Sequence, residues 1–259
     1  MLAYIMSNVI KIKKGLDINL KGKAEKIFEK SDMADTYALK PTDFYGLTPK
    51  LSVKIDDKVK AGSPLFFDKY NQKVFYTSPV SGKVASINRG ERRKILEVIV
   101  EPDDKQEYEQ FTKNDPTTLS REEIVENLLK SGIWPAIRQR PYNIVANPDD
   151  EPKSIFISAF DSAPLAPDYD FIMQDQEKEF QLGINALNKL TPGKIHLGIN
   201  DDFPPAKAFA NAQNVQLNRF QGKHPAGNVG VQIHHVDPIN KGEIIWTVKP
   251  QDVVIIGRL

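Results

Sequence analysis

Cysteine is absent from this sequence of 259 residues, and its absence excludes several kinds of chemistry at once. A chain without thiols forms no disulfide, no thiolate zinc site, no cysteine nucleophile and no cysteine-ligated iron–sulfur cluster. The composition therefore fits the reducing conditions of a cytoplasm. We expect no metal cofactor in this chain.

An excess of charge of either sign is also lacking. The 35 lysines and arginines nearly balance the 34 aspartates and glutamates, so no global electrostatic field attracts nucleic acid or anionic lipid. Long apolar runs are missing as well, because no stretch approaches the roughly 20 residues that cross a bilayer. We therefore expect no nucleic-acid partner and no transmembrane segment.

Several catalytic motifs are missing too. The sequence contains no Walker loop, no Gly-x-Ser-x-Gly turn and no His-Glu-x-x-His helix. These motifs supply a phosphate cradle, a serine nucleophile and a zinc site, respectively. Their absence argues against hydrolysis and phosphoryl transfer.

A β-rich stretch at residues 46–101 is the first feature that is present. Short apolar segments alternate there with turn residues, and this pattern occurs twice. Such spacing favours short strands over helices. Segments 53–66 and 78–87 resemble the biotinyl/lipoyl carrier domains, flattened sandwiches of two four-stranded sheets. Those domains present a modified lysine at a hairpin tip.

At that tip this sequence offers Lys69 or Lys73, without the small or methionine neighbours that such carriers show. Two interpretations follow from this. The stretch is either a docking or structural element with unmodified lysines, which we favour, or a lipoyl- or biotin-type carrier modified at Lys69 or Lys73.

The segments on either side of this stretch set the domain boundaries. Residues 9–20 predict a short edge strand, and its lysines face solvent and discourage pairing with other chains. A polar linker begins at Pro102. We therefore predict an N-terminal domain at residues 1–105 and a second domain at residues 106–259.

The second domain alternates between strand and helix patterns. It opens with a helix that Ser120 caps, with Glu123 in its first turn and Gly132 at its end. The further expected helices are 180–190 and 205–212, and the expected strands are 154–160, 194–199, 215–217, 229–236, 244–248 and 253–256. This order predicts an open α/β sheet with right-handed crossovers.

The loop after the first of these helices does not fit a phosphate-binding loop. Backbone amides approach a pyrophosphate closely only through successive glycines, whereas Trp134 and Pro135 follow Gly132 here. Arg138 and Arg140 are able to meet an anion. Their alternative role is that of surface or interface residues.

The four histidines do not form a metal site in the predicted fold. His234 and His235 are neighbours on an expected strand, so their side chains would point to opposite faces. No carboxylate or thiol cluster accompanies any of the four, and we interpret them as structural. The glycine-rich loop 220–230 between two expected strands either presents its amides to a ligand or partner or forms a tight turn.

A series of short motifs resembles one known family over nearly the whole chain, in order and in spacing: the A subunits of the sodium-translocating NADH:quinone reductases. The motifs are residues 14–18, 77–82, 87–91, 131–134, 190–194, 224–227 and 246–253. The resemblance implies a multidomain α+β protein, with a biotinyl/lipoyl-like barrel-sandwich hybrid β domain followed by a Rossmann-like α/β domain. It also implies that the chain is the N-terminal portion of a longer protein with further C-terminal domains.

The α/β domain of this family is related to the flavoprotein subunit of respiratory complex I, which binds FMN through a glycine-rich loop and iron–sulfur clusters through cysteines. Both features are missing here, so the resemblance implies a degraded flavin loop and no cofactor in this chain. The degraded loop comprises Gly132, Trp134, Pro135, Arg138 and Arg140. FMN, FAD, riboflavin and iron–sulfur centres are expected on other subunits.

The implied function is that of a peripheral subunit, without catalysis of its own, in a complex that couples electron flow from NADH to ubiquinone with Na⁺ export. Its implied place is the cytoplasmic face of the bacterial inner membrane, bound to the other subunits, including the membrane subunits. The alternative is a quinone-binding subunit that takes direct part in the reaction. Candidate quinone or partner contacts are Phe220, His224, Pro225, Gly227 and Trp246.

Overall fold

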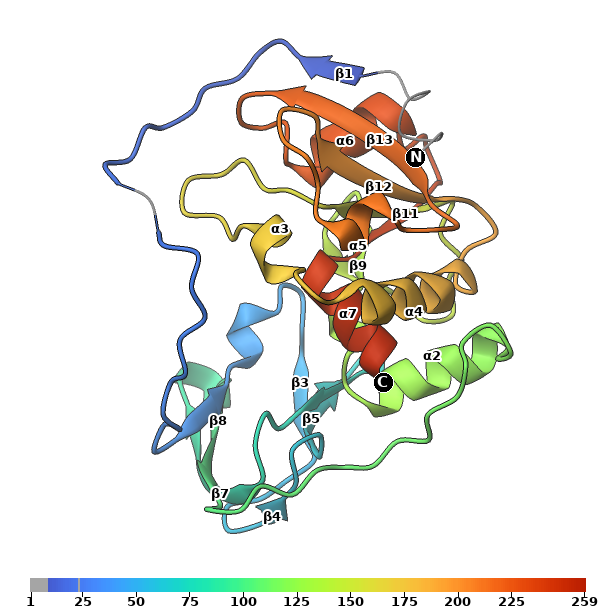
Figure 1. Ribbon diagram of the computed structural model, residues 1–259. Coiled ribbons are helices and arrows are strands. Elements are labelled where there is room, and N and C mark those ends of the chain that lie inside the picture. Colours follow the sequence, from blue (N-terminus) through green and yellow to red (C-terminus); the bar gives the residue numbers. More distant parts are fainter. Residues whose placement is uncertain (1–8, 23) are drawn as a thin grey trace. The chain divides into compact units, whose positions relative to one another are not determined.

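A computed structural model describes residues 9–22 and 24–259 of the chain (Figure 1). The chain divides into two compact units. The α/β unit comprises the residues up to 27 together with 114–124 and 136–259, and the β unit comprises 28–113 and 125–135. The first eight residues of the predicted N-terminal domain lie outside the described residues.

The β unit consists of two antiparallel sheets, with strand orders β2-β8-β7-β4 and β3-β5-β6. The strands are β2 (Tyr37–Leu39), β3 (Pro49–Leu51), β4 (Lys58–Val59), β5 (Pro64–Asp68), β6 (Phe75–Thr77), β7 (Gly82–Arg89) and β8 (Ile95–Pro102). The predicted β-rich stretch is confirmed. In the described residues the β3-β5-β6 sheet has three strands, whereas the resemblance to carrier domains implied four.

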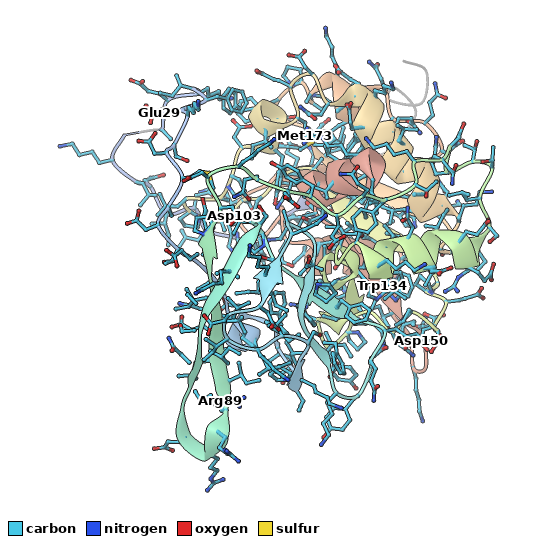
Figure 2. All side chains as sticks on the ribbon, turned by 90° about the horizontal axis from the view of Figure 1, so that it is seen from below. Glu29, Arg89, Asp103, Trp134, Asp150 and Met173 are labelled. Carbon is cyan, nitrogen blue, oxygen red and sulfur yellow. The ribbon has the colours of Figure 1, made fainter. Side chains whose placement is uncertain are left out.

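The core of the β unit consists of apolar residues from several of its strands. Leu65, Phe66, Val84 and Val98 have no solvent-exposed surface, and the Phe66 ring stacks on Tyr76 with centroids 5.1 Å apart. Val84 and Val98 alternate with more exposed residues, the pattern that places one face of a strand in the core, whereas Leu65 and Phe66 are consecutive, at an irregularity in the pairing of β5 with β6. Figure 2 shows Arg89 at the far end of the β7–β8 hairpin.

The two candidate carrier lysines lie in the connection between β5 and β6. Both Lys69 and Lys73 are exposed, and the Lys69 amine lies 5.8 Å from the Tyr70 ring centroid. Exposure is compatible with either interpretation of the β unit. Modification of either lysine therefore stays a prediction.

Helix α2 (Arg121–Lys130) begins at the predicted cap. The backbone N–H of Glu123 donates to Ser120 Oγ at 3.2 Å, and the Ser120 N–H donates to Glu123 Oε2 at 2.8 Å. This reciprocal pair satisfies two amides that lack partners within the helix. The predicted start of the helix is thereby confirmed.

The α/β unit contains a seven-stranded sheet with the order β1-β13-β12-β11-β14-β9-β10. The strands are β1 (Val9–Ile12), β9 (Arg138–Arg140), β10 (Ile144–Val145), β11 (Ile155–Ser158), β12 (Ile195–Asn200), β13 (Gln216–Gly222) and β14 (Ile245–Thr247). The first five strands in the order run parallel to one another, β9 pairs antiparallel to β14, and β10 pairs antiparallel to β9. The predicted open α/β sheet is confirmed.

The α/β unit has five helices in the described residues; α6 packs on the sheet, and α4 packs against α7. The helices are α3 (Tyr169–Ile172), α4 (Glu177–Asn188), α5 (Lys207–Ala210), α6 (Val229–Val236) and α7 (Pro250–Arg258). Ile233 of α6 packs in a cluster with Phe156 of β11 and Ile245 of β14. Helices α4 and α7 approach so closely that a Cβ on Gly183 would overlap the Val253 carbonyl oxygen.

Two predicted strands are helices in the structure. Residues 229–236 form α6, because the Asn228 side chain caps the helix and one helical face packs on the sheet. Residues 253–256 lie within α7, which starts with Pro250, a residue suited to the first turn of a helix. The predictions of strands at 229–236 and 253–256 were therefore wrong.

The N-terminal edge strand is confirmed, but its sheet is not the expected one. β1 pairs in parallel with β13, Val9 opposite Arg219 and Ile12 opposite Gly222. The structure thus differs from the predicted division at residues 105 and 106, because the first strand completes the sheet of the α/β unit. None of the helices in the described part of the chain has the length and apolar character needed to span a bilayer.

Candidate functional site

The loop 224–228, which joins β13 to α6, is fixed by polar contacts at the carboxyl end of the parallel strands. The Gly227 N–H donates to Ser162 Oγ at 2.9 Å, and the same oxygen lies 3.1 Å from His224 Nδ1. The His224 backbone N–H donates to Asp17 Oδ1 at 2.9 Å. In open α/β sheets, ligands bind at this end of the strands.

These contacts also orient the His224 ring. Since Ser162 Oγ accepts from Gly227, its own hydrogen is available for His224 Nδ1. A hydroxyl oxygen accepts up to two hydrogen bonds, so the contact forms equally well with the ring proton on Nδ1 and Ser162 Oγ as its acceptor. In either case it fixes the orientation of the half-buried imidazole through Nδ1.

Gly227 permits the loop to lie close against the segment after β11. A Cβ there would come within 2.5 Å of the Ser162 backbone nitrogen. The side chain of Gln232 on α6 makes two further contacts: its Nε2 donates to Ser158 Oγ on β11 at 2.8 Å and to the Ala226 carbonyl oxygen of the loop at 3.3 Å. The loop is thus anchored to both β11 and α6.

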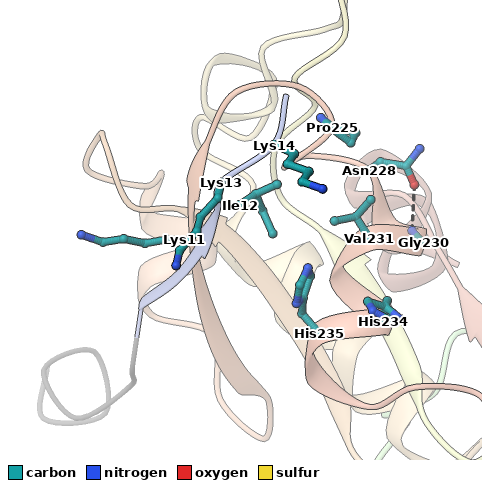
Figure 3. A pocket seen from close by; sticks show the side chains of 10 residues that line it. All are labelled: Lys11, Ile12, Lys13, Lys14, Pro225, Asn228, Gly230, Val231, His234 and His235. Carbon is teal, nitrogen blue, oxygen red and sulfur yellow. Dashed lines mark hydrogen bonds between the residues drawn. The ribbon is translucent and has the colours of Figure 1, made fainter. Parts of the chain in front are cut away.

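A pocket of about 770 Å³ lies beside this loop, between the end of β1 and the face of α6 (Figure 3). We call it the basic pocket. Its lining residues are Lys11, Ile12, Lys13, Lys14, Pro225, Asn228, Gly230, Val231, His234 and His235. Its size is that of sites for small organic ligands, which occupy roughly 300–1,000 Å³.

His234 and His235 line the basic pocket together. Their ring centroids lie 5.2 Å apart, in an edge-to-face arrangement. The prediction that they point to opposite faces was wrong, because consecutive residues of a helix are turned by about 100°, not 180°. No group of three or more metal-ligating side chains occurs in the described part of the chain.

The structure brings together three of the five candidate quinone contacts. His224, Pro225 and Gly227 share the loop, and Pro225 also lines the basic pocket. Phe220 and Trp246 are completely buried, on β13 and β14, with β12 and β11 between them. The five residues therefore do not line a single slot.

The residues predicted to form a degraded flavin loop fall into two groups. Gly132 ends α2 with φ of +76°, and a Cβ there would lie 2.5 Å from Thr77 Oγ1. Trp134 and Pro135 are buried in the short helix η3 (Trp134–Ala136).

Arg138 and Arg140 belong instead to β9. Burial, and secondarily the charge of Arg138, lowers the pKa of the Arg140 guanidinium. Whether these residues descend from a flavin site stays a prediction.

Two titratable groups with shifted pKa values, the buried His196 and the half-buried Asp252, belong to the fold of the α/β unit. Burial lowers the pKa of His196 to about 4, and its ring stacks on Phe156 with centroids 4.4 Å apart. Burial raises the pKa of Asp252, in the first turn of α7, to about 6. The His196 ring is therefore uncharged at neutral pH, and the Asp252 carboxyl is held there as a half-buried anion at a cost in stability.

Comparison with known proteins gives matches over both units. Residues 10–103 match the family model for the NqrA N-terminal barrel-sandwich hybrid domain, and residues 119–259 match that for the NqrA second alpha/beta domain. The Na(+)-translocating NADH-quinone reductase A subunit of Hahella chejuensis is 42% identical over 257 residues, and that of Neisseria meningitidis serogroup A is 39% identical over 255.

The protein of the same name from Haemophilus influenzae is 36% identical over 255 residues. Each of these alignments covers 97% of the chain and 56% of the relative. The chain thus spans just over half the length of the curated relatives that it matches.

Proposed function

The chain belongs to the family of the A subunits of the Na(+)-translocating NADH-quinone reductases, and from this premise we propose that it is a peripheral, non-catalytic subunit of such a complex. The observation that supports this most is the match of both family models, which together cover most of the chain. The lack of cysteine supports it further, because the chain offers no thiolate for an iron–sulfur centre.

The proposal extends to partners and place. The subunit binds the other subunits of the complex, including the membrane subunits, at the cytoplasmic face of the bacterial inner membrane. NADH oxidation, the flavins, the iron–sulfur centre and the sodium path belong to those subunits. The second family domain, residues 119–259, is a relative of the complex I flavoprotein that has lost flavin, and the bulky buried pair Trp134 and Pro135 supports this.

Co-purification tests the proposal. A tag on this chain, expressed in a bacterium together with the remaining subunits, is expected to retain them through mild detergent extraction. The eluate should reduce quinone with NADH, with a sodium dependence that the isolated chain lacks. Recovery of the tagged chain free of every other subunit would contradict the proposal.

A second candidate function is direct quinone binding, and the oriented imidazole of His224 favours it. A quinone carbonyl needs a hydrogen-bond donor beside an apolar wall, and His224 Nε2, next to Pro225, supplies one when the Ser162 hydroxyl donates to Nδ1. We expect saturable binding of a short-chain ubiquinone to the isolated chain by calorimetry. His224→Phe keeps a ring but removes the donor, and roughly fivefold weaker binding is expected.

Lys223→Gln is the control for this measurement. It changes an exposed neighbour of His224 without touching the imidazole, so its quinone affinity should equal that of the wild type. A flat titration of the wild-type chain, or equal affinities for both variants, would count against a role for His224 in quinone binding.

A further inference from the structure

The hairpin formed by β7 and β8 extends past the strands that flank it. β2 pairs with β8 only at residues 98–100, and β4 pairs with β7 only at residues 82 and 83. In the described part of the chain, residues 88–97 therefore form a ribbon of two strands without a third strand beside them. Figure 2 shows Arg89 near the end of this ribbon. Because an isolated two-stranded ribbon is only marginally stable in water, the extension adds little to the stability of the β unit.

The turn at the end of this ribbon concentrates positive charge, and we call residues 89–94 the basic turn. Arg89, Arg92, Arg93 and Lys94 lie within it, with Glu91 as its one acidic residue. Four positive charges against one negative charge give the turn a formal charge of +3, whereas the whole chain carries +1. All five side chains are exposed. Among the described residues, no carboxylate forms an ion pair with any of the four cations.

The backbone of the basic turn holds arginine in a conformation that suits glycine better. Arg92 has φ of +53° and ψ of +30°, and Arg93 has φ of +61°. This left-handed region disfavours residues that carry a Cβ. The turn is closed by the Gly90 N–H, which donates to the Lys94 carbonyl oxygen at 2.8 Å, and by Arg89 Nη1, which donates to the Arg93 carbonyl oxygen at 3.1 Å. Two arginines kept at such positions point to a use for their side chains outside the fold.

The chemistry of the basic turn favours phosphate groups carried on a flat surface. A guanidinium group binds a phosphate through two parallel charge-assisted hydrogen bonds. A surface that carries many phosphates does not require the four side chains to converge on one point. Clusters of lysine and arginine are attracted to bilayers of anionic lipid in this way. The exposed Leu96 beside the turn adds an apolar group that can enter the headgroup region.

We propose that the basic turn binds the phosphate groups of anionic phospholipids and holds the β unit at the membrane surface, an inference that rests on the peripheral position proposed above. An acidic protein surface would also attract the four cations. It would need a hollow that matches the protruding turn, whereas a bilayer adapts to any shape. The attraction acts between exposed charges in water, so it weakens as the salt concentration rises.

Sedimentation of the whole chain with lipid vesicles tests the proposal. We expect the chain to sediment with phosphatidylglycerol vesicles at low salt, to be released by added sodium chloride, and not to sediment with phosphatidylcholine vesicles. The test variant Arg92→Asn/Arg93→Asn removes two charges, and asparagine tolerates positive φ. Its affinity for phosphatidylglycerol should fall roughly fivefold for each charge removed, or about 25-fold in all. Its unfolding in urea should occur at no lower concentration than that of the wild type.

The matched control is Lys54→Gln/Lys58→Gln, which removes the same charge from exposed positions of the β unit. These residues lie near the other end of β7, where β4 pairs with it. The control variant should keep most of the wild-type affinity for phosphatidylglycerol vesicles. No sedimentation of the wild type with these vesicles, or an equal loss in the two variants, would overturn the proposal.

The competing partner, an acidic protein surface, gives a different result. In that case the test variant would bind phosphatidylglycerol as the wild type does but would lose the other subunits in the co-purification described above, and the lipid proposal would be wrong. The vesicle measurement needs no other subunit. Its failure would therefore leave the proposed membership of the complex intact, and failed co-purification of the wild type would leave the vesicle result intact.

Discussion

Replacing Gly183 by alanine is expected to lower the free energy of unfolding of the α/β unit by about 2–3 kcal/mol, since overpacking a well-packed contact costs that much. A Cβ at this position would overlap the Val253 carbonyl oxygen and lie 2.7 Å from Val253 Cγ1. Backbone cannot yield locally to such a contact, so α7 must move away from α4. Urea unfolding followed by circular dichroism measures the loss.

Gly230→Ala is the matched control, because it makes the same change inside another helix. Its Cβ would meet only Asn228 Oδ1, at 3.1 Å, and the better helix propensity of alanine offsets that contact by up to about 1 kcal/mol. We expect this variant to stay within about 1 kcal/mol of the wild type. Equal losses in the two variants would show that the α4–α7 contact tolerates a methyl group.

Replacing Asp252 by asparagine is expected to stabilise the protein at neutral pH and not in acid. Burial raises the pKa of this carboxyl to about 6, well above its usual value of 3.8. Between these two values the folded state binds more protons than the unfolded state, so the stability contribution of Asp252 falls as pH rises through the interval. Above pH 6 the full cost remains, at most about 3 kcal/mol, and asparagine removes it.

The measurement is the difference in unfolding free energy between variant and wild type at pH 4 and pH 7.5. We expect a difference near zero at the lower pH and a gain of about 2 kcal/mol at the higher one. Taking the difference is necessary because His196, with a pKa lowered to about 4, destabilises the folded state on acidification and acts in the opposite direction.

The exposed Asp202→Asn is the control for removing a negative charge. Its amide oxygen can still accept from Gln221 Nε2, as the Asp202 carboxylate does at 2.8 Å. A gain for Asp252→Asn that is independent of pH would contradict the assignment of its cost to buried charge.

Much of the fold could be predicted because local sequence and tertiary environment agree. The β11 and β12 segments are apolar on both faces, as strands at the centre of a parallel sheet require. The start of α2 followed from Ser120 and Glu123, which form the predicted reciprocal cap. In both cases the local residue pattern is compatible with only one kind of secondary structure.

The last two helices could not be predicted in the same way, because β-branched residues dominate them. Val229, Val231 and Ile233 alternate as a strand would, yet Val229 and Ile233 also lie on one helical face, which packs on Phe156. The segment is a helix because Asn228 caps it and because burial of its apolar face outweighs the intrinsic strand propensity of these residues. The available signals were Asn228, the N-cap of α6, and Pro250, the first residue of α7.

The basic pocket could not be predicted because its two walls are far apart in the sequence. The lysines of residues 11–14 were interpreted only as protection of an edge strand, which they also provide. The approach of this segment to α6 depends on the parallel pairing of β1 with β13. Nothing local to either segment indicates that pairing.

That pairing has a consequence for how the protein is made. As the chain emerges from the ribosome, Val9 has no place in a sheet until its partner Arg219 has been synthesised. Contacts of such long range slow folding, because the intervening chain must first be ordered. A nascent polypeptide therefore exposes its leading strand through most of translation, and that strand is the part of the α/β unit for which a ribosome-associated chaperone would have most use.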